Sequence, residues 1–289
     1  MAQTQAHELQ LSRLEHKYIV SPEVALAVRD FVASYLEIDE FGATHPNLSY
    51  PVHSLYLDSD DLRIYWGTIN GDKNRYKLRL RFYENRPNAP VYFEIKRRMN
   101  NAIMKQRGAV RRDAVSQVLA GMLPSPEQMT STDPRQLLAI QRFVELAATV
   151  GAKPKAHIAY QREAWVQPDD NSIRVTLDRD VLCCVDTTTE LRTEMDRPFC
   201  VFGKSVVLEL KFTGRFPDWF AELVRTFNLH QSSAAKYADG VALMGESLFS
   251  AAGGLAPGPE YVRHRAERIT ALKRRAEPTP YCPEMLNHV

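Results

Sequence analysis

The chain has 289 residues, of which 44% are hydrophobic, and its formal net charge is only +2. This composition is typical of a globular protein with a substantial core, in one large domain or two ordinary ones. It contains no signal peptide and no apolar run of the roughly 18 residues that a membrane span requires, so we expect a soluble, cytoplasmic protein. The cysteines lack metal-site spacing and are expected to be reduced thiols: Cys183, Cys184, Cys200 and Cys282.

The N-terminal half is predicted to combine one helix with several strands. A first strand over Arg13–Tyr18 is followed by Ser21-Pro22-Glu23, which is typical of a helix start and predicts a helix to about Leu36. Further strands are expected at residues 52–57, 63–69, 75–82, 91–98 and 103–111. Asn70-Gly71 predicts a hairpin turn into the strand at 75–82, and Asn100-Asn101 a turn between the last two strands.

The C-terminal half is predicted to be helical first and then mixed. Helices are expected at residues 113–120, 134–151, 217–229 and 232–249, and strands at residues 155–166, 173–181 and 206–212. From Gly253 onward a Gly/Pro link leads to an Arg- and Lys-rich segment at 261–275, either a surface helix or partly disordered. We therefore expect a main domain over 1–250 and a basic tail over 251–289.

The segment Arg75–Phe82 alternates a cation with an apolar residue without a break. On a strand, Arg75, Lys77, Arg79 and Arg81 share one face, because successive side chains point to opposite faces. Like charges aligned on one face repel each other, so this face is expected to hold a strongly anionic ligand. A polyphosphate chain is the natural candidate.

The same alternation recurs in other strands, and three of them contain Glu-x-Lys. These are Glu15-His16-Lys17, Glu94-Ile95-Lys96 and Glu209-Leu210-Lys211. Each segment alone can be an amphipathic strand with its polar face in water. Together they indicate an α+β fold in which a closed antiparallel β-barrel turns its basic faces inward, with helices over the apolar faces.

The order of these segments resembles the VTC domain of the polyphosphate polymerase family, within the triphosphate tunnel metalloenzyme (CYTH-like) superfamily. The resemblance covers roughly residues 10–245 and rests on the order of the whole set. The matching pieces are Arg13–Tyr18, Ser54–Asp58, Lys77–Arg81, Glu94–Lys96, Lys105–Arg107, Tyr160–Arg162, Arg174–Asp178, Glu209–Lys211 and Lys236–Gly240.

The resemblance implies an enzyme that transfers the γ-phosphate of ATP onto a growing polyphosphate chain in a basic tunnel, using Mn²⁺ or Mg²⁺. The implied phosphate-gripping residues are Lys17, Arg79, Arg81, Lys96, Lys105, Arg162, Arg174 and Lys236. Further substrate contacts are expected from Lys77, Arg107 and Lys211, with Tyr160 beside the nucleotide. Glu209 is the implied metal ligand, with Glu15 or Glu94 nearby.

Two departures from the family pattern qualify this resemblance. Ala235 stands where the family commonly has Ser, so one hydroxyl contact is missing. The SPX domain and membrane segments of eukaryotic relatives do not occur in this sequence, so we expect a bacterial stand-alone form. A membrane-protein partner that carries the product away is compatible with the family context.

Phosphoryl transfer requires mainly positioning and neutralisation of charge, and a terminal phosphate acceptor needs no general base. Three alternatives stay open. The acids could be counter-ions only; the protein could be a hydrolase of triphosphate, nucleoside triphosphate or polyphosphate; or it could bind such ligands without turnover. Triphosphatases typically begin Glu-x-Glu-x-Lys, and Arg13 in place of the first acid favours the polymerase. Nucleic acid is not an expected partner, because Tyr76 and Phe82 fall opposite the cations.

Overall fold

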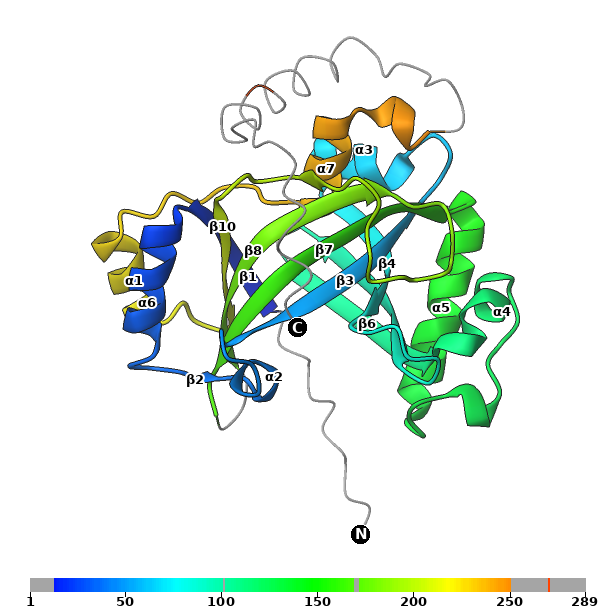
Figure 1. Ribbon diagram of the computed structural model, residues 1–289, viewed down its shortest axis with the longest axis horizontal. Helices are drawn as coiled ribbons and strands as arrows, with labels where there is room; N and C mark the ends of the chain where they lie inside the picture. Colours follow the sequence, from blue (N-terminus) through cyan, green and yellow to red (C-terminus); the bar gives the residue numbers. More distant parts are fainter. Residues whose placement is uncertain (1–12, 101, 169–171, 251–269, 271–289) are drawn as a thin grey trace.

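A computed structural model describes residues 13–100, 102–168, 172–250 and 270 (Figure 1). Its strands are β1 (Arg13–Val20), β2 (Glu37–Ile38), β3 (Ser49–Asp58), β4 (Asn74–Phe82), β5 (Pro90–Met99), β6 (Ala102–Arg111), β7 (Lys153–Val166), β8 (Ile173–Val185), β9 (Phe199–Cys200) and β10 (Val206–Thr213). Its α-helices are α1 (Pro22–Val32), α2 (Glu40–Ala43), α3 (Arg63–Ile69), α4 (Val115–Leu119), α5 (Pro134–Val150), α6 (Asp218–Thr226) and α7 (Lys236–Met244). The predicted segment 261–275 and Cys282 lie outside the described residues, and the domain boundary at 250 stays a prediction.

The strands form one antiparallel sheet in the order β2-β7-β3-β4-β5-β6-β1-β10-β8-β9, with an additional β7–β8 pairing. The sheet is strongly curved, so that β6 and β1 approach each other. Within the described residues only Arg13 and Ile103 pair there, whereas the β1–β10 ladder runs from Arg13 to Val20. The prediction of a closed barrel is therefore wrong. Within the described residues the sheet is open along the β1–β6 edge, because the stagger carries the rest of β1 past the start of β6.

Helices α1, α5 and α6 pack on apolar parts of the outer face of the sheet (Figure 1). Leu78, Leu80 and Phe82 of β4 are buried and belong to one hydrophobic cluster with Ile140 and Phe143 of α5. This is the outcome that the alternation of β4 predicts. A second cluster packs α1 and α6 against β1, β8 and β10. Removal of these apolar side chains from water supplies the main driving force for folding.

The ends of two helices follow the predicted signals. The Ser21 hydroxyl accepts a hydrogen bond from the backbone N–H of Val24 at the start of α1, which ends at Val32, before the expected residue 36. Asp133 caps α5 in the same way, and Gly151 ends α5 in the left-handed conformation with φ +63°. These caps satisfy backbone groups that have no partner within the helix.

The segment Arg63–Ile69 is helix α3, and the predicted strand is wrong. The buried Asp58 carboxylate accepts hydrogen bonds from the backbone N–H groups of Ile64 (2.9 Å) and Tyr65 (2.8 Å). These bonds satisfy donors that a new helix leaves unpaired, so the helix is favoured over the local β propensity. Asn70-Gly71 consequently ends a helix and does not form a hairpin turn.

Helix α7 lies beside α3 at one end of the curved sheet (Figure 1). The Tyr237 hydroxyl donates to Asp58 (2.8 Å), and the Tyr237 ring stacks on Tyr56 of β3 with centroids 5.0 Å apart. Residues 236–242 of α7 are all buried. This packing places Lys236, the first residue of α7, against the charged face of the sheet.

Two further expectations concern the cysteines and a membrane span. Cys183, Cys184 and Cys200 are free thiols, as predicted. No helix in the described ranges combines the length and the apolar character needed to cross a membrane.

Candidate functional site

The face of the sheet opposite the helix-covered face carries the charged side chains, and we call it the inner face. Ten cations lie in its central part: Lys17, Lys77, Arg79, Arg81, Lys96, Lys105, Arg107, Arg162, Lys211 and Lys236. Four carboxylates lie among them: Glu15, Glu94, Asp178 and Glu209. The structure thus gathers the predicted phosphate-binding cations on one surface with an excess of positive charge. Arg174, which lies directly opposite Lys211, shares this face but pairs with another carboxylate.

Strands β4, β5 and β6 align these cations in rows. Lys77 lies directly opposite Lys96, which in turn lies opposite Lys105. In the next row, Arg79 faces Glu94, which faces Arg107. Like charges placed directly opposite each other destabilise a sheet. A row of three lysines therefore indicates a surface that is formed for an anionic ligand.

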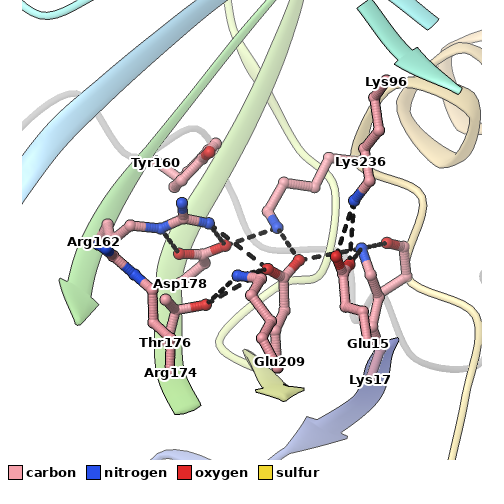
Figure 2. A network of polar contacts seen from close by, with 12 residues as sticks. Glu15, Lys17, Lys96, Tyr160, Arg162, Arg174, Thr176, Asp178, Glu209 and Lys236 are labelled. Carbon is pink, nitrogen blue, oxygen red and sulfur yellow. Dashed lines mark hydrogen bonds and ion pairs between the residues drawn. The ribbon is translucent and has the colours of Figure 1, made fainter. Parts of the chain in front are cut away.

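Glu209 of β10 is the centre of a buried cluster of ion pairs (Figure 2). Its carboxylate oxygens lie 2.5 Å from Lys211 Nζ, 3.0 Å from Lys17 Nζ and 3.3 Å from Lys236 Nζ. Lys17 Nζ also lies 3.1 Å from Glu15, and it donates a hydrogen bond to a backbone carbonyl of the chain before α7. Lys17 therefore bridges Glu15 and Glu209.

Asp178 of β8 extends this cluster, although we did not predict a role for it. It accepts two hydrogen bonds from the Arg162 guanidinium, at 2.7 and 2.8 Å, and lies 2.6 Å from Lys236 Nζ. Its side chain is fully buried. The signal was present in the sequence, because Arg174, Thr176 and Asp178 alternate with Val175 and Leu177 and therefore share one face of the strand.

Glu94 of β5 forms a second, separate group of ion pairs. It lies 2.6 Å from both Arg79 and Lys105, 3.6 Å from Arg107 and 3.8 Å from Arg81. One buried carboxylate thus compensates four neighbouring cations only in part. Within the described residues the Arg81 Nε group has no hydrogen-bond acceptor.

Two tyrosines hold arginines of the second group in place. The Tyr56 hydroxyl accepts a hydrogen bond from Arg79 (3.1 Å), and the Tyr160 hydroxyl accepts one from Arg81 (3.2 Å). Arg162 and Lys236 lie 5.1 and 4.9 Å from the centroid of the Tyr160 ring, within the range of cation–π attraction. Tyr160, predicted beside a nucleotide, therefore lies buried between the two groups of ion pairs.

The crowding of cations changes their protonation. Burial lowers the pKa of Lys211 and of Lys105 to about 7, against the attraction of Glu209 and Glu94. Burial and the neighbouring Lys17 and Lys96 hold the pKa of Lys77 well below its ordinary value. An anion bound at the inner face would favour the charged form of each lysine.

The carboxylates remain ionised despite their burial. Burial alone raises the pKa of Asp178, but Arg162 and Lys236 lower it to about 2. Lys17, Lys211 and Lys236 likewise hold the pKa of Glu209 well below its usual range. The carboxylates are therefore negative at neutral pH and hold the cations in place.

Arg174 lies on the same face but pairs with a carboxylate that belongs to neither group. Its guanidinium lies 2.8 Å from Asp39, which caps α2 and also accepts a hydrogen bond from Tyr50 (3.0 Å). The predicted phosphate contact of Arg174 therefore competes with an ion pair that already satisfies it.

A preformed cage of metal ligands is not found. Across the ranges that the structure describes, no three His, Cys, Asp or Glu side chains lie close enough to hold a metal ion. Hard divalent cations that bridge phosphates, however, use only one or two protein carboxylates and keep several waters. Glu15 and Glu209, which share Lys17, fit that smaller requirement, whereas Glu94 belongs to the other group.

Comparisons with known proteins agree on the family. A model of the VTC domain matches residues 12–245. The vacuolar transporter chaperone complex subunit 4 of Schizosaccharomyces pombe (strain 972 / ATCC 24843) is 26% identical over 181 residues, which cover 56% of this chain and 25% of that protein. The chain therefore spans about a quarter of the length of this curated relative.

Among solved structures, a putative adenylate cyclase from Bacillus halodurans is similar at 14% identity, covering 78% of this chain and 94% of that chain. Its TM-score of 0.44 is too low to support a functional argument.

Proposed function

This chain belongs to the VTC domain family, and from that premise we propose that it is a polyphosphate polymerase. It would transfer the γ-phosphate of ATP onto the end of an inorganic polyphosphate chain. The observation that carries the proposal is the inner face itself, where ten cations from the strands and from α7 lie among four carboxylates. A linear polyanion can contact several of these rows at once.

The cations would supply the positioning and the charge neutralisation that phosphoryl transfer requires. Arg79 and Arg81 are held by tyrosine hydroxyls and present planar guanidinium groups, which suit two phosphate oxygens at once. Lys17 and Lys236 lie between the carboxylates of the Glu209 cluster and would act as point charges on the transferring phosphate. The terminal phosphate acceptor is already ionised, so no side chain is assigned as a general base.

The carboxylates would have two different roles. We propose that Glu209, with Glu15, would hold Mn²⁺ or Mg²⁺ together with phosphate oxygens, and that Glu94 acts as the counter-ion of its arginines. When bound, the ion would neutralise charge on the phosphate oxygens. Asp178 would keep Arg162 and Lys236 oriented through its three short contacts.

The name of the S. pombe relative describes a subunit of a complex. This supports the proposal that the present chain also works with a protein partner, in addition to ATP and polyphosphate as ligands.

The test is a time course with ATP and Mn²⁺, with and without a short polyphosphate primer, followed by phosphorus NMR. We expect growth of the internal-phosphate signal together with ADP, and loss of both in Glu209→Ala. The matched control is Glu145→Ala, which removes an exposed glutamate of α5. Free orthophosphate without polymer would establish a hydrolase, and binding of ATP without turnover would establish a non-catalytic binder. Either result would overturn the proposal.

A further inference from the structure

The rows of cations on β4 and β5 continue beyond the two groups of ion pairs. Arg75 lies directly opposite Arg98, next to the row that contains Lys77 and Lys96. Strands rise about 3.3 Å per residue, so the Arg75 row lies roughly 7 Å beyond the lysine row and roughly 20 Å from Arg81. The cationic track therefore extends to the end of this strand pair.

A pocket of about 330 Å³ lies at that end, lined by Gly71, Lys73, Arg75, Arg98 and Asn100. We call it the distal arginine pocket. Among the described residues, its lining contains three cations and no carboxylate. The nearest acid in the sequence, Asp72, has its carboxylate against Gly67 of α3 and does not line the pocket. The pocket is thus suited to an anion.

The turns around the pocket hold it in shape. Gly71 and Asn100 both adopt positive φ, +73° and +54°, and the Asn100 N–H donates to the Lys73 carbonyl (2.9 Å), which joins the two turns. Arg98 Nε donates to the Asn100 carbonyl (2.8 Å), and Arg75 donates to the Asp72 carbonyl. Each guanidinium is therefore positioned by the backbone while it lines the pocket.

The other end of the same strand pair has a different chemistry. There Arg81 lies opposite Tyr92, and the Arg107 guanidinium lies 3.5 Å from the centroid of the Tyr92 ring. Tyr83, just after β4, contacts Tyr92 edge to face. Aromatic rings thus accompany the cations at that end, whereas the described lining of the distal arginine pocket consists of three cations, a glycine and an asparagine. A ligand with no apolar part matches the arginine end.

We propose that the distal arginine pocket binds phosphate units of an inorganic polyphosphate chain that has grown beyond the inner face. This inference rests on the proposed function, because it assigns to the pocket the product of that reaction. Lys73, Arg75 and Arg98 would contact phosphate oxygens through charge-assisted hydrogen bonds. The pocket would therefore increase the affinity for long chains and leave short ones, which reach only the inner face, unaffected.

The test compares the double variant Arg75→Gln/Arg98→Gln with Arg135→Gln/Arg215→Gln. The control removes the same charge at two exposed arginines that pair with Asp133 and Asp218. Dissociation constants are measured for tripolyphosphate and for a long polyphosphate of narrow length distribution, after equal thermal unfolding midpoints show that both variants are folded. Loss of charge-assisted contacts predicts about tenfold weaker binding of the long chain only. Equal weakening for both ligands, or no more weakening than in the control, would overturn the inference.

A second readout separates this inference from the proposed function. With ATP and Mn²⁺, we expect Arg75→Gln/Arg98→Gln to make shorter polymer than the wild type, as seen on a gel. If the wild type makes no polymer, the proposed function fails, and the binding comparison still decides whether the pocket holds polyphosphate. If the wild type makes polymer and the variant matches it in length and affinity, only the pocket is ruled out.

Discussion

Glu209 is a buried carboxylate whose main contacts are lysines, and this makes its charge important for folding. Its side chain is 6% exposed, and three lysine Nζ atoms lie within 3.3 Å of it. Removing one partner of a buried ion pair leaves the remaining charge uncompensated. The contribution of Glu209 to the stability of the fold therefore depends on its charge and not only on its shape.

We expect Glu209→Gln, which keeps the shape but removes the charge, to lower the free energy of unfolding by about 3 kcal/mol. Glu145→Gln should change it by less than about 0.5 kcal/mol, because the Glu145 pair with Arg142 is exposed. Urea unfolding of both variants measures the difference. If Glu209→Gln changes the free energy of unfolding no more than Glu145→Gln does, Glu209 is not a structural counter-ion, and ligand binding is left as its proposed role.

The lysines with lowered pKa predict a linkage between protons and ligand. Burial lowers the pKa of Lys105 and of Lys211 to about 7, so near neutral pH each is only partly protonated in the free protein. A bound polyanion favours the charged form, so tripolyphosphate binding should take up protons. Its affinity should fall as the pH rises from about 6 to about 9.

Calorimetry in buffers of different ionisation enthalpy measures this proton uptake directly, and Lys211→Met should reduce it.

The stability of the free protein should rise with pH, whereas the affinity for tripolyphosphate falls. Because the unfolded chain holds these protons up to its ordinary lysine pKa of 10.5, the contribution of both lysines to stability increases from about pH 7 towards that value. Binding without proton exchange would contradict the assigned protonation.

Among the elements, α3 and α7 show how a distant contact determines the position of a site residue. Asp58 accepts hydrogen bonds from two backbone N–H groups of α3 and from the Tyr237 hydroxyl of α7. Lys236 directly precedes Tyr237 and reaches Asp178 and Glu209. The carboxylate of Asp58 therefore fixes the helix that carries Lys236.

Asp58→Ala should destabilise the protein by about 3 kcal/mol, because it leaves several buried donors unpaired. Asp133→Ala removes the exposed cap of α5 and should cost about 1 kcal/mol. Thermal unfolding measures both. We also expect weaker tripolyphosphate binding in Asp58→Ala alone, since only there is Lys236 displaced. Equal affinities in the two variants would show that α7 keeps its position without Asp58.

The sequence predicts those parts of these elements that depend on local pattern. The side chains of β4 that face inward follow from the alternation of polar and apolar residues, because successive side chains of a strand point to opposite faces. This prediction requires no knowledge of the partner strand. The identity of α3 could not be found in this way, because Asp58 and Tyr237 are 179 residues apart in the chain. The open β1–β6 edge was missed for a related reason, since strand stagger is a property of the assembled sheet. The ion pair between Arg174 and Asp39 could not be predicted either, because the two residues are 135 positions apart in the chain.

At the scale of the whole molecule, the charge is distributed unevenly. The chain has 37 Lys and Arg and 35 Asp and Glu, and the central part of the inner face alone holds ten of the former and four of the latter. The rest of the chain therefore carries more acids than cations, although the total is close to neutral. Concentrated charge of one sign attracts a counter-charged ligand and destabilises the fold that contains it. We infer that the free protein is less stable than the same fold with fewer inner cations.

Substitution of Lys77 tests most directly whether the inner cations lower the stability of the free protein. Within the described residues Lys77 has no carboxylate at ion-pair distance, and burial with neighbouring cations lowers its pKa. Lys77→Met should therefore raise the free energy of unfolding of the free protein by about 1 kcal/mol, as expected where a residue is retained for function. The same variant should gain less stability from saturating tripolyphosphate, because the ligand loses one cationic partner.

Lys153→Met removes an exposed lysine paired with Asp60 and serves as the control. Thermal unfolding with and without the ligand measures both effects, and a Lys77→Met variant that is less stable than the wild type would show that Lys77 supports the fold and not the ligand.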